Sequence, residues 1–218
     1  MKKTITIVLI ALVAVGFGYF LFRISPQPVN TSLNDKDVKP VTQPSDLTAA
    51  DHILGNPNAK NTMIIFEDLE CPACANFNRQ VTGKVPTELK DTKVVFRHFP
   101  LVQIHQNAVP AANALEAAGA QGKFWEFANA AYEKQTEWSN LADTLPYFEG
   151  IAKQVGVKDL EKFKTDVQNQ AYKAKIESNY REGLALNLQG TPSVFFNGQK
   201  IELGDINSVK LQAEKLYK

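Results

Sequence analysis

The feature that most constrains this chain is a pair of cysteines placed directly after a buried strand. Cys71-Pro72-Ala73-Cys74 holds the only two cysteines among 218 residues. The pair follows the apolar run of residues 63–66, which predicts a buried strand. Two cysteines form at most one bond, and a core of this size does not need a disulfide for stability. The spacing and context therefore favour thiol chemistry over a structural role.

The segment after the cysteines predicts the rest of a strand–helix–strand unit. Residues 52–58 predict a short edge element and turn before the first strand, and residues 93–97 predict the second strand, which ends at His98. Between the strands, residues 75–90 carry apolar side chains at near four-residue spacing, which is typical of a helix. Gly83 and Pro86 are expected to kink it. This order predicts a parallel strand pair with a right-handed crossover.

Helical patterns fill residues 103–188, and no strand is expected there. Asp159 is a suitable N-cap for the last helical segment. The aromatic side chains of Phe124, Trp125 and Phe127 are expected to form the core of this insertion rather than a ligand cage. The expected helices cover residues 108–120, 123–135, 145–155 and 159–186.

A hairpin and a helix are predicted at the end of the chain. Two apolar segments, residues 193–196 and 200–203, flank Asn197-Gly198. This dipeptide predicts a type I′ turn because it supplies the positive φ angles that the turn needs. Residues 206–217 predict a closing amphipathic helix.

The N-terminal residues predict membrane attachment. Residues 4–22 contain no charged side chain, and nineteen helical residues nearly match a hydrocarbon core of about 30 Å. Because no Ala-x-Ala pattern follows, an uncleaved anchor over residues 1–24 is favoured over a cleaved signal. Lys2 and Lys3 favour a cytoplasmic N-terminus and an extracytoplasmic domain, although Arg23 weakens the asymmetry. The polar, proline-containing residues 25–50 predict a flexible linker, which leaves residues 51–218 as the folded domain.

Charge and ligand counts exclude several function classes. The chain has 24 basic and 23 acidic residues, so its net charge of +1 gives no surface field suited to nucleic acid. A zinc site needs four ligands, and His98 and His105 have no metal-like spacing to the cysteines. Both histidines are expected to be structural, and neither a metal nor another cofactor is expected. The acids Glu67, Asp68 and Glu70 are expected to form a solvated rim.

These elements together resemble the thioredoxin fold in its DsbA-like form, over residues 51–218. The resemblance is carried by Cys71-Pro72-Ala73-Cys74 at a strand–helix junction and by Gly190-Thr191-Pro192 before a hairpin and closing helix. Local stretches at residues 96–101, 121–125 and 190–196 are also similar to those of membrane-tethered or secreted bacterial relatives. The resemblance implies an α/β fold in which a large helical insertion separates the βαβ and ββα halves.

The family pattern also implies roles for individual residues. Cys71 corresponds to the exposed nucleophile, Cys74 to the buried resolving thiol, and Pro192 to the cis-proline that faces the disulfide. Thr191 would tune contacts with the sulfur and with the substrate backbone. The chain departs from the pattern at Ile65, where many relatives carry a buried acid that transfers protons to the second thiol.

The function implied is an extracytoplasmic thiol–disulfide oxidoreductase that donates its disulfide to exported proteins. A monomer is expected, with a membrane partner of the DsbB or VKOR type to reoxidise it. Two alternatives remain open: a disulfide isomerase or reductase, and a binding or chaperone module that carries a structural disulfide on the same scaffold.

The sequence predicts a moderately oxidising cysteine pair. Placement at a helix N-terminus favours the Cys71 thiolate and so the reduced form. Ala73, however, offers no side-chain donor, and the nearby acids oppose negative charge on the sulfur. Equilibration with glutathione buffers should therefore give an intermediate potential. A value as reducing as that of thioredoxin would refute this expectation.

Overall fold

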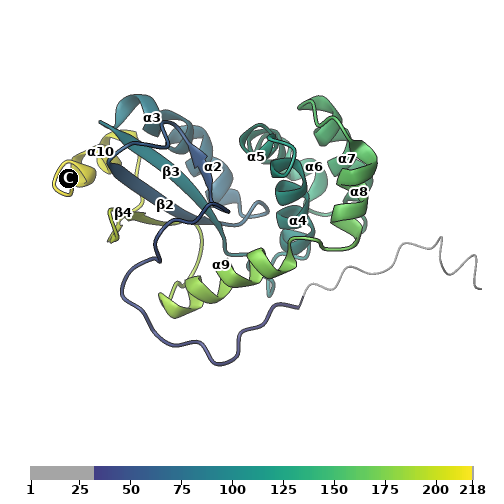
Figure 1. The fold of residues 1–218 in the computed structure, drawn as a ribbon, viewed down its shortest axis with the longest axis horizontal. Helices are drawn as coiled ribbons and strands as arrows, with labels where there is room; N and C mark the ends of the chain where they lie inside the picture. Colours follow the sequence, from purple (N-terminus) through teal and green to yellow (C-terminus); the bar gives the residue numbers. More distant parts are fainter. Residues whose placement is uncertain (1–31, 218) are drawn as a thin grey trace, which may run out of the picture. The chain divides into compact units, whose positions relative to one another are not determined.

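The computed structural model describes residues 32–217, which form a five-stranded sheet with helices on both faces (Figure 1). The strand order is β1-β3-β2-β4-β5. Strands β2 (Asn61–Glu67) and β3 (Thr92–His98) are parallel, with Met63 opposite Val94. Strand β1 (His52–Leu54) pairs antiparallel with β3, and β4 (Ser193–Phe196) pairs antiparallel with β2. The predicted strand–helix–strand unit is confirmed.

The two faces of β2 pack against different helices because successive side chains of a strand point to opposite sides. Met63 and Ile65 lie in one apolar cluster with residues of α2 (Pro72–Gln80), α3 (Val85–Glu88) and α10 (Ile206–Ala213). Ile64 and Phe66 lie in a second cluster with residues of α9 (Lys173–Ala185). The centre of the sheet is therefore covered on both sides.

The sequence predicted a kink in the helix after the cysteines, and the structure has a full break there. Helix α2 ends at Gln80, a 3₁₀ turn spans Thr82–Lys84, and α3 follows with Pro86 in its first turn. The predicted stripe of Phe77, Val81, Val85 and Leu89 is buried throughout.

The C-terminal hairpin is also confirmed. Strands β4 (Ser193–Phe196) and β5 (Gln199–Ile201) are antiparallel, and Asn197 and Gly198 join them with φ angles of 48° and 85°. Only a left-handed backbone closes such a two-residue turn, and glycine adopts it without steric cost.

A helical insertion lies between β3 and β4. Its helices are α4 (Ala108–Gly119), α5 (Phe124–Glu133), α6 (Gln135–Trp138), α7 (Leu145–Gln154), α8 (Leu160–Gln168) and α9. Phe124 and Phe127 are buried and Trp125 is partly buried in its core, as predicted. Asp159 caps α8 by accepting a hydrogen bond from the Lys162 amide at 2.8 Å. The prediction of one continuous helix over residues 159–186 is wrong. The structure has two helices there, α8 and α9, which are separated at Gln170, where φ is 50°.

The insertion is joined to the sheet by a buried polar cluster around Glu116 of α4. Its carboxylate lies 2.8 Å from His98 Nε2 and 3.0 Å from His52 Nε2, and it accepts a hydrogen bond from Lys175 Nζ at 2.9 Å. Burial raises the pKa of Glu116, but His52 and His98 outweigh it and hold that pKa below its ordinary value. His98 thus has the structural role that its position predicted.

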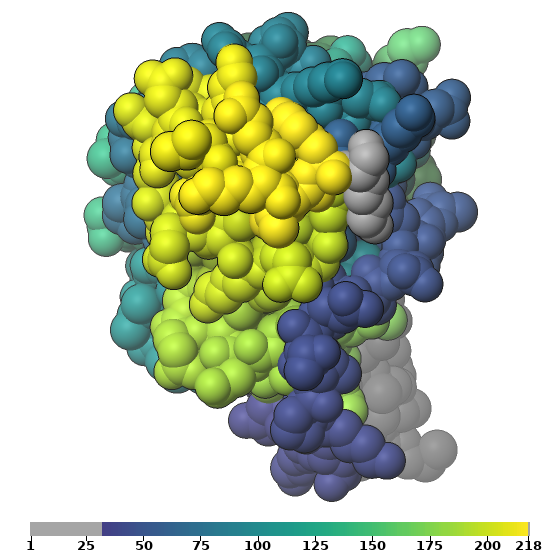
Figure 2. All heavy atoms as spheres, turned by 90° about the vertical axis from the view of Figure 1, so that its left-hand side faces the viewer, coloured from purple at the N-terminus to yellow at the C-terminus, as the bar shows by residue number. Residues whose placement is uncertain are grey.

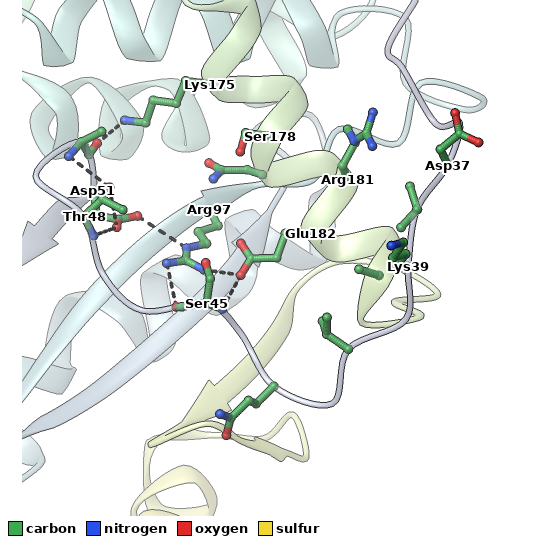
Figure 3. A pocket seen from close by; sticks show the side chains of 16 residues that line it. Asp37, Lys39, Ser45, Thr48, Asp51, Arg97, Lys175, Ser178, Arg181 and Glu182 are labelled. Carbon is green, nitrogen blue, oxygen red and sulfur yellow. Dashed lines mark hydrogen bonds and ion pairs between the residues drawn. The ribbon is translucent and has the colours of Figure 1, made fainter.

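The segment before β1 is attached to the domain, whereas the sequence predicted a linker as far as residue 50. The Val41 amide donates to the Ala185 carbonyl at 2.9 Å. Buried Arg97 of β3 binds Ser45 Oγ at 3.0 Å and Glu182 Oε1 at 2.5 Å, and its Nε lies 3.5 Å from Asp51 Oδ1 (Figure 3). Figure 2 shows this segment, in purple, running along the surface of the domain. The fold therefore includes residues before position 51, because Arg97 needs their oxygen atoms.

The predicted anchor, residues 1–24, lies outside the described residues. Within residues 32–217, no helix is both long and apolar enough to cross a bilayer.

Replacing Arg97 should destabilise the fold strongly. Arg97→Ala leaves the carboxylates of Asp51 and Glu182 without their buried cation, and such truncations cost about 3–5 kcal/mol. Urea denaturation measures the change in unfolding free energy. Lys162→Ala is the control, since Lys162 is 52% exposed and its pair with Asp166 should contribute less than about 1 kcal/mol. Equal, small effects of the two substitutions would contradict this role of Arg97.

Candidate active site

Cys71 lies at the N-terminus of α2, where β2 ends and the chain turns. It is the N-cap residue, with extended backbone angles, and Pro72 occupies the first helical position without losing a hydrogen bond. Both cysteines are free thiols in the structure. Only 6% of the Cys71 surface is exposed and none of Cys74, so any exchange with a partner must take place at Cys71.

The two sulfur atoms have opposite electrostatic environments. The Cys74 thiol lowers the pKa of Cys71 to about 5, helped by the side chain of Thr191 and by the backbone amides of Cys74 and Ala73, while burial opposes them. Burial raises the pKa of Cys74 well above its ordinary value, and the nearby Cys71 and Glu67 raise it further. At neutral pH, Cys71 is therefore the thiolate and Cys74 the thiol.

The turn before β4 faces the nucleophile. The Thr191–Pro192 peptide bond is cis, as the resemblance implied. Cys71 Sγ lies 3.4 Å from the Thr191 carbonyl oxygen, across 120 positions of sequence. The fold therefore brings all four predicted site residues, Cys71, Cys74, Thr191 and Pro192, to one place.

A pocket of about 310 Å³ lies beside this turn, lined by residues 189–194 and 200–203. A larger pocket of about 680 Å³ lies between residues 37–51 and α9 (Figure 3). Neither pocket has a cysteine in its lining, but the smaller one is lined by Thr191 and Pro192, and the Thr191 carbonyl oxygen lies 3.4 Å from Cys71 Sγ. The smaller pocket is therefore the better candidate for a substrate chain near the sulfur atoms.

The acids that precede Cys71 are buried, so their assignment to a solvated rim was wrong. Glu67, Asp68 and Glu70 are 1%, 2% and 7% exposed. Glu67 shares a strand face with Ile65, because the two residues are two positions apart in β2. That face leads to α2 and the cysteines.

Glu67 is held in its neutral form. Burial raises its pKa to about 8, and negative charge on Cys71 contributes to the rise. The Tyr132 hydroxyl is near enough to offset burial in part, yet neither carboxyl oxygen of Glu67 has a hydrogen-bond partner in the described part of the chain. A buried acid that interacts with both cysteines can gain or lose a proton close to both thiols.

The comparison with protein families agrees with this geometry. A thioredoxin family model matches residues 47–213, which include both cysteines and the cis-proline. The chain belongs to the thioredoxin family.

Among solved structures, the chain is similar to thiol–disulfide exchange proteins of the DsbA type. Oxidised BdbD from Bacillus subtilis superposes with a TM-score of 0.70 at 25% identity, over 84% of this chain and 98% of BdbD. A double cysteine-to-alanine variant of alpha-DsbA1 from Wolbachia pipientis gives 0.66 at 25% identity, over 78% of this chain and 92% of that protein. The DsbA-like thioredoxin fold predicted from sequence is confirmed, and it supports the general class of thiol–disulfide oxidoreductase.

A longer curated protein is similar to this chain over part of its length. Na(+)/H(+) antiporter NhaA 1 of Mycolicibacterium gilvum is 31% identical over 204 residues, which covers 87% of this chain. The match covers 30% of the antiporter, so the chain spans less than a third of that relative's length.

Two side chains beside this thioredoxin site were not singled out by sequence. Gln135, buried at the start of α6, donates from Nε2 to the carbonyls of Leu69 at 2.7 Å and of Cys71 at 3.0 Å. Tyr132 lies fully buried beside Glu67. Both come from the helical insertion, more than sixty residues from Cys71, and no local spacing connects them to it.

The described residues contain no group of three or more histidine, cysteine, aspartate or glutamate side chains arranged to hold a metal ion.

Glu67→Gln should remove a pH dependence of stability from this thioredoxin domain. In the unfolded chain Glu67 ionises near its ordinary pKa of 4.5, whereas in the fold its pKa is about 8. Below pH 4.5 both states are protonated. Above it the unfolded state loses a proton that the folded state keeps, so wild-type stability falls as pH rises to about 8, by up to about 5 kcal/mol.

The measurement is urea unfolding of the reduced wild type and variant at pH 4.5, 6 and 8. The stability difference should shift in favour of the variant as pH rises. Glu133→Gln, at an exposed position of α5, is the matched control and should show no such trend. Parallel pH profiles for wild type and Glu67→Gln would show that Glu67 is not a high-pKa buried acid.

Proposed function

We propose that the protein is an extracytoplasmic thiol–disulfide oxidoreductase that donates disulfides to exported proteins. The observation that carries the proposal is the contrast between a stabilised Cys71 thiolate and a buried Cys74 thiol. A stabilised thiolate favours the reduced enzyme, so the disulfide form is an oxidant. This contrast agrees with the oxidising potential expected from sequence and favours the oxidase over the reductase.

The proposed reaction begins with attack on the enzyme disulfide. A substrate thiolate attacks Cys71 Sγ, the Cys71–Cys74 bond breaks, and a mixed disulfide forms with Cys71. Cys74 leaves with the electron pair and takes a proton, because burial disfavours its thiolate. Glu67, neutral below about pH 8, is the acid placed to give that proton.

A second substrate thiolate then attacks the substrate sulfur of the mixed disulfide. The new substrate disulfide forms, and Cys71 leaves as a thiolate, which its low pKa favours. Two electrons and two protons of the substrate dithiol have then been removed. One proton restores Glu67, which gave its own to Cys74, and the other passes to solvent, so the reduced enzyme holds a Cys71 thiolate and a Cys74 thiol. Return to the disulfide requires a second oxidant, for which a membrane protein of the DsbB or VKOR type is proposed.

The substrate is proposed to be an extended, unfolded chain. The pocket beside Thr191 and Pro192 adjoins Leu203, a large apolar side chain that is 50% exposed. An apolar residue next to a substrate cysteine would fit this surface, and such residues are exposed in chains that have not yet folded.

The location outside the cytoplasm rests on the charge and length of residues 1–24, which predict an anchor with a cytoplasmic N-terminus. The similarity to a region of a longer Na(+)/H(+) antiporter supports a location of this domain beside a membrane. Disulfides persist in exported proteins and not in the cytosol, so the proposed activity fits this location. The protein is proposed to act there as a monomer.

The test is the oxidation of a reduced, unfolded protein by the preoxidised enzyme. Cys71→Ser should lower the rate to that of the uncatalysed reaction. Cys74→Ser keeps Cys71 but lacks the second thiol. When Cys71 of this variant carries glutathione, a substrate thiolate should displace the glutathione, and the resulting enzyme–substrate mixed disulfide should accumulate, as detected by mass spectrometry. Undiminished oxidation by Cys71→Ser would reject the enzyme and favour a binding module. Catalysed reshuffling of wrong disulfides without net oxidation would favour an isomerase.

A further inference from the structure

His105 lies in the loop between β3 and α4 and contacts the turn that carries the nucleophile. Its Nδ1 is 2.7 Å from Asp68 Oδ2. The Asp68 side chain is fully buried, and that of His105 is 14% exposed. The sequence assigned His105 a structural role, since no local spacing joins it to a residue 37 positions earlier.

Asp68 connects this loop to Cys71. Its Oδ2 also accepts from the Leu101 amide at 2.9 Å, and its Oδ1 accepts from the Glu70 amide at 2.8 Å. The Asp68 carbonyl accepts from the Cys71 amide at 3.1 Å. One buried residue therefore fixes both the imidazole of His105 and the backbone that positions the nucleophilic sulfur.

The charges that converge here are unbalanced without His105. Asp68 and Glu70 lie on the turn, and Glu70 Oε2 accepts from the Asn107 amide at the start of α4 at 2.7 Å. Burial raises the pKa of Glu70 to about 7, which nearby His105 partly offsets. Glu67 faces the same sulfur atom from β2. Because Glu67 is neutral below about pH 8, Asp68 and Glu70 are the acids whose negative charge opposes a thiolate here, and Ala73 between the cysteines brings no charge.

We propose that His105 is a positioning residue for the thiol chemistry, in which its imidazolium, held by Asp68, balances the charge beside Cys71 and favours the thiolate. The proposal rests on the proposed function, because it concerns the same sulfur atom. The hydrogen bond to Asp68 raises the pKa of His105, and Glu70 and Cys71 raise it further.

The coupling between the two groups is reciprocal. If the imidazolium favours the thiolate, the thiolate must favour the imidazolium by the same factor. His105 therefore binds its proton more tightly in the reduced protein, where Cys71 is charged, than in the disulfide, where it is not. Reduction then takes up an additional fraction of a proton at His105, and the potential depends more steeply on pH where His105 titrates.

The first experiment uses the wild-type full chain with isotope-labelled histidine. The sequence has three histidines, so three imidazole resonances are followed through a pH titration of the oxidised and of the reduced protein. The His105 dissociation constant should be about fivefold smaller in the reduced protein. His52 and His98 bind Glu116 and serve as internal controls with smaller changes. An equal His105 titration in both redox states would overturn the proposal.

The second experiment compares His105→Gln with His52→Gln, the matched control. Thiolate absorbance at 240 nm against pH gives the Cys71 dissociation constant, and glutathione buffers give the equilibrium with the disulfide. His105→Gln should weaken Cys71 ionisation by about the same fivefold factor and make the disulfide a weaker oxidant. His52→Gln should change neither quantity. A merely structural His105 would leave the Cys71 titration unchanged in a folded variant.

The outcomes separate the two proposals. Normal exchange with glutathione and a redox-independent His105 titration would overturn the role of His105 alone. Cysteines that never exchange would overturn the proposed function and the role of His105 together.

Discussion

Two sulfur atoms three residues apart experience opposite electrostatic conditions, and the rest of the site depends on this contrast. Cys71 lies at the free amides that begin α2 and ionises easily, whereas Cys74 lies one turn further into the core and does not. The first turn of this helix creates both conditions at once, because Cys71 is its N-cap beside exposed Pro72 and Ala73, whereas Cys74 is on the buried side of the same turn. The sheet, through β2, sets where that helix begins.

The remaining parts of the site come from distant regions that the fold brings to this junction. Thr191 and Pro192 approach from the turn before β4, Gln135 and Tyr132 from the helical insertion, and His105 from the loop after β3. Each contributes a type of interaction that the Cys-Pro-Ala-Cys segment lacks: a carbonyl and hydroxyl beside the sulfur, a donor for backbone carbonyls, and a basic group. The insertion therefore contacts the cysteine turn directly, through Gln135.

How far the sequence predicts this arrangement depends on the range of the interactions. The strand pair, the type I′ turn at Asn197 and the cap at Asp159 were predictable, since each rests on neighbouring residues. The cis-proline was predictable only through resemblance to a family, and the nucleophilic role of Cys71 is a prediction from the same resemblance. The burial of Glu67 was not, because an acidic residue after a strand has the same local pattern whether it faces solvent or α2. The break at Gln170 was missed for a similar reason, as neither glycine nor proline marks it.

Gln135 has a consequence for how the domain can be divided. Insertions in a fold are often treated as modules that can be exchanged or removed without disturbing the parent scaffold. Here the amide of Gln135 is the hydrogen-bond donor to the carbonyls of both Leu69 and Cys71. A minimal version without the insertion would remove the Gln135 donor from the buried Leu69 carbonyl, at a desolvation cost of about 1–3 kcal/mol. The Cys71 carbonyl would lose one of its two donors and keep the Ala75 amide at 3.1 Å. Parent scaffold and insertion therefore form one indivisible unit, and chimaeras between relatives should exchange them together.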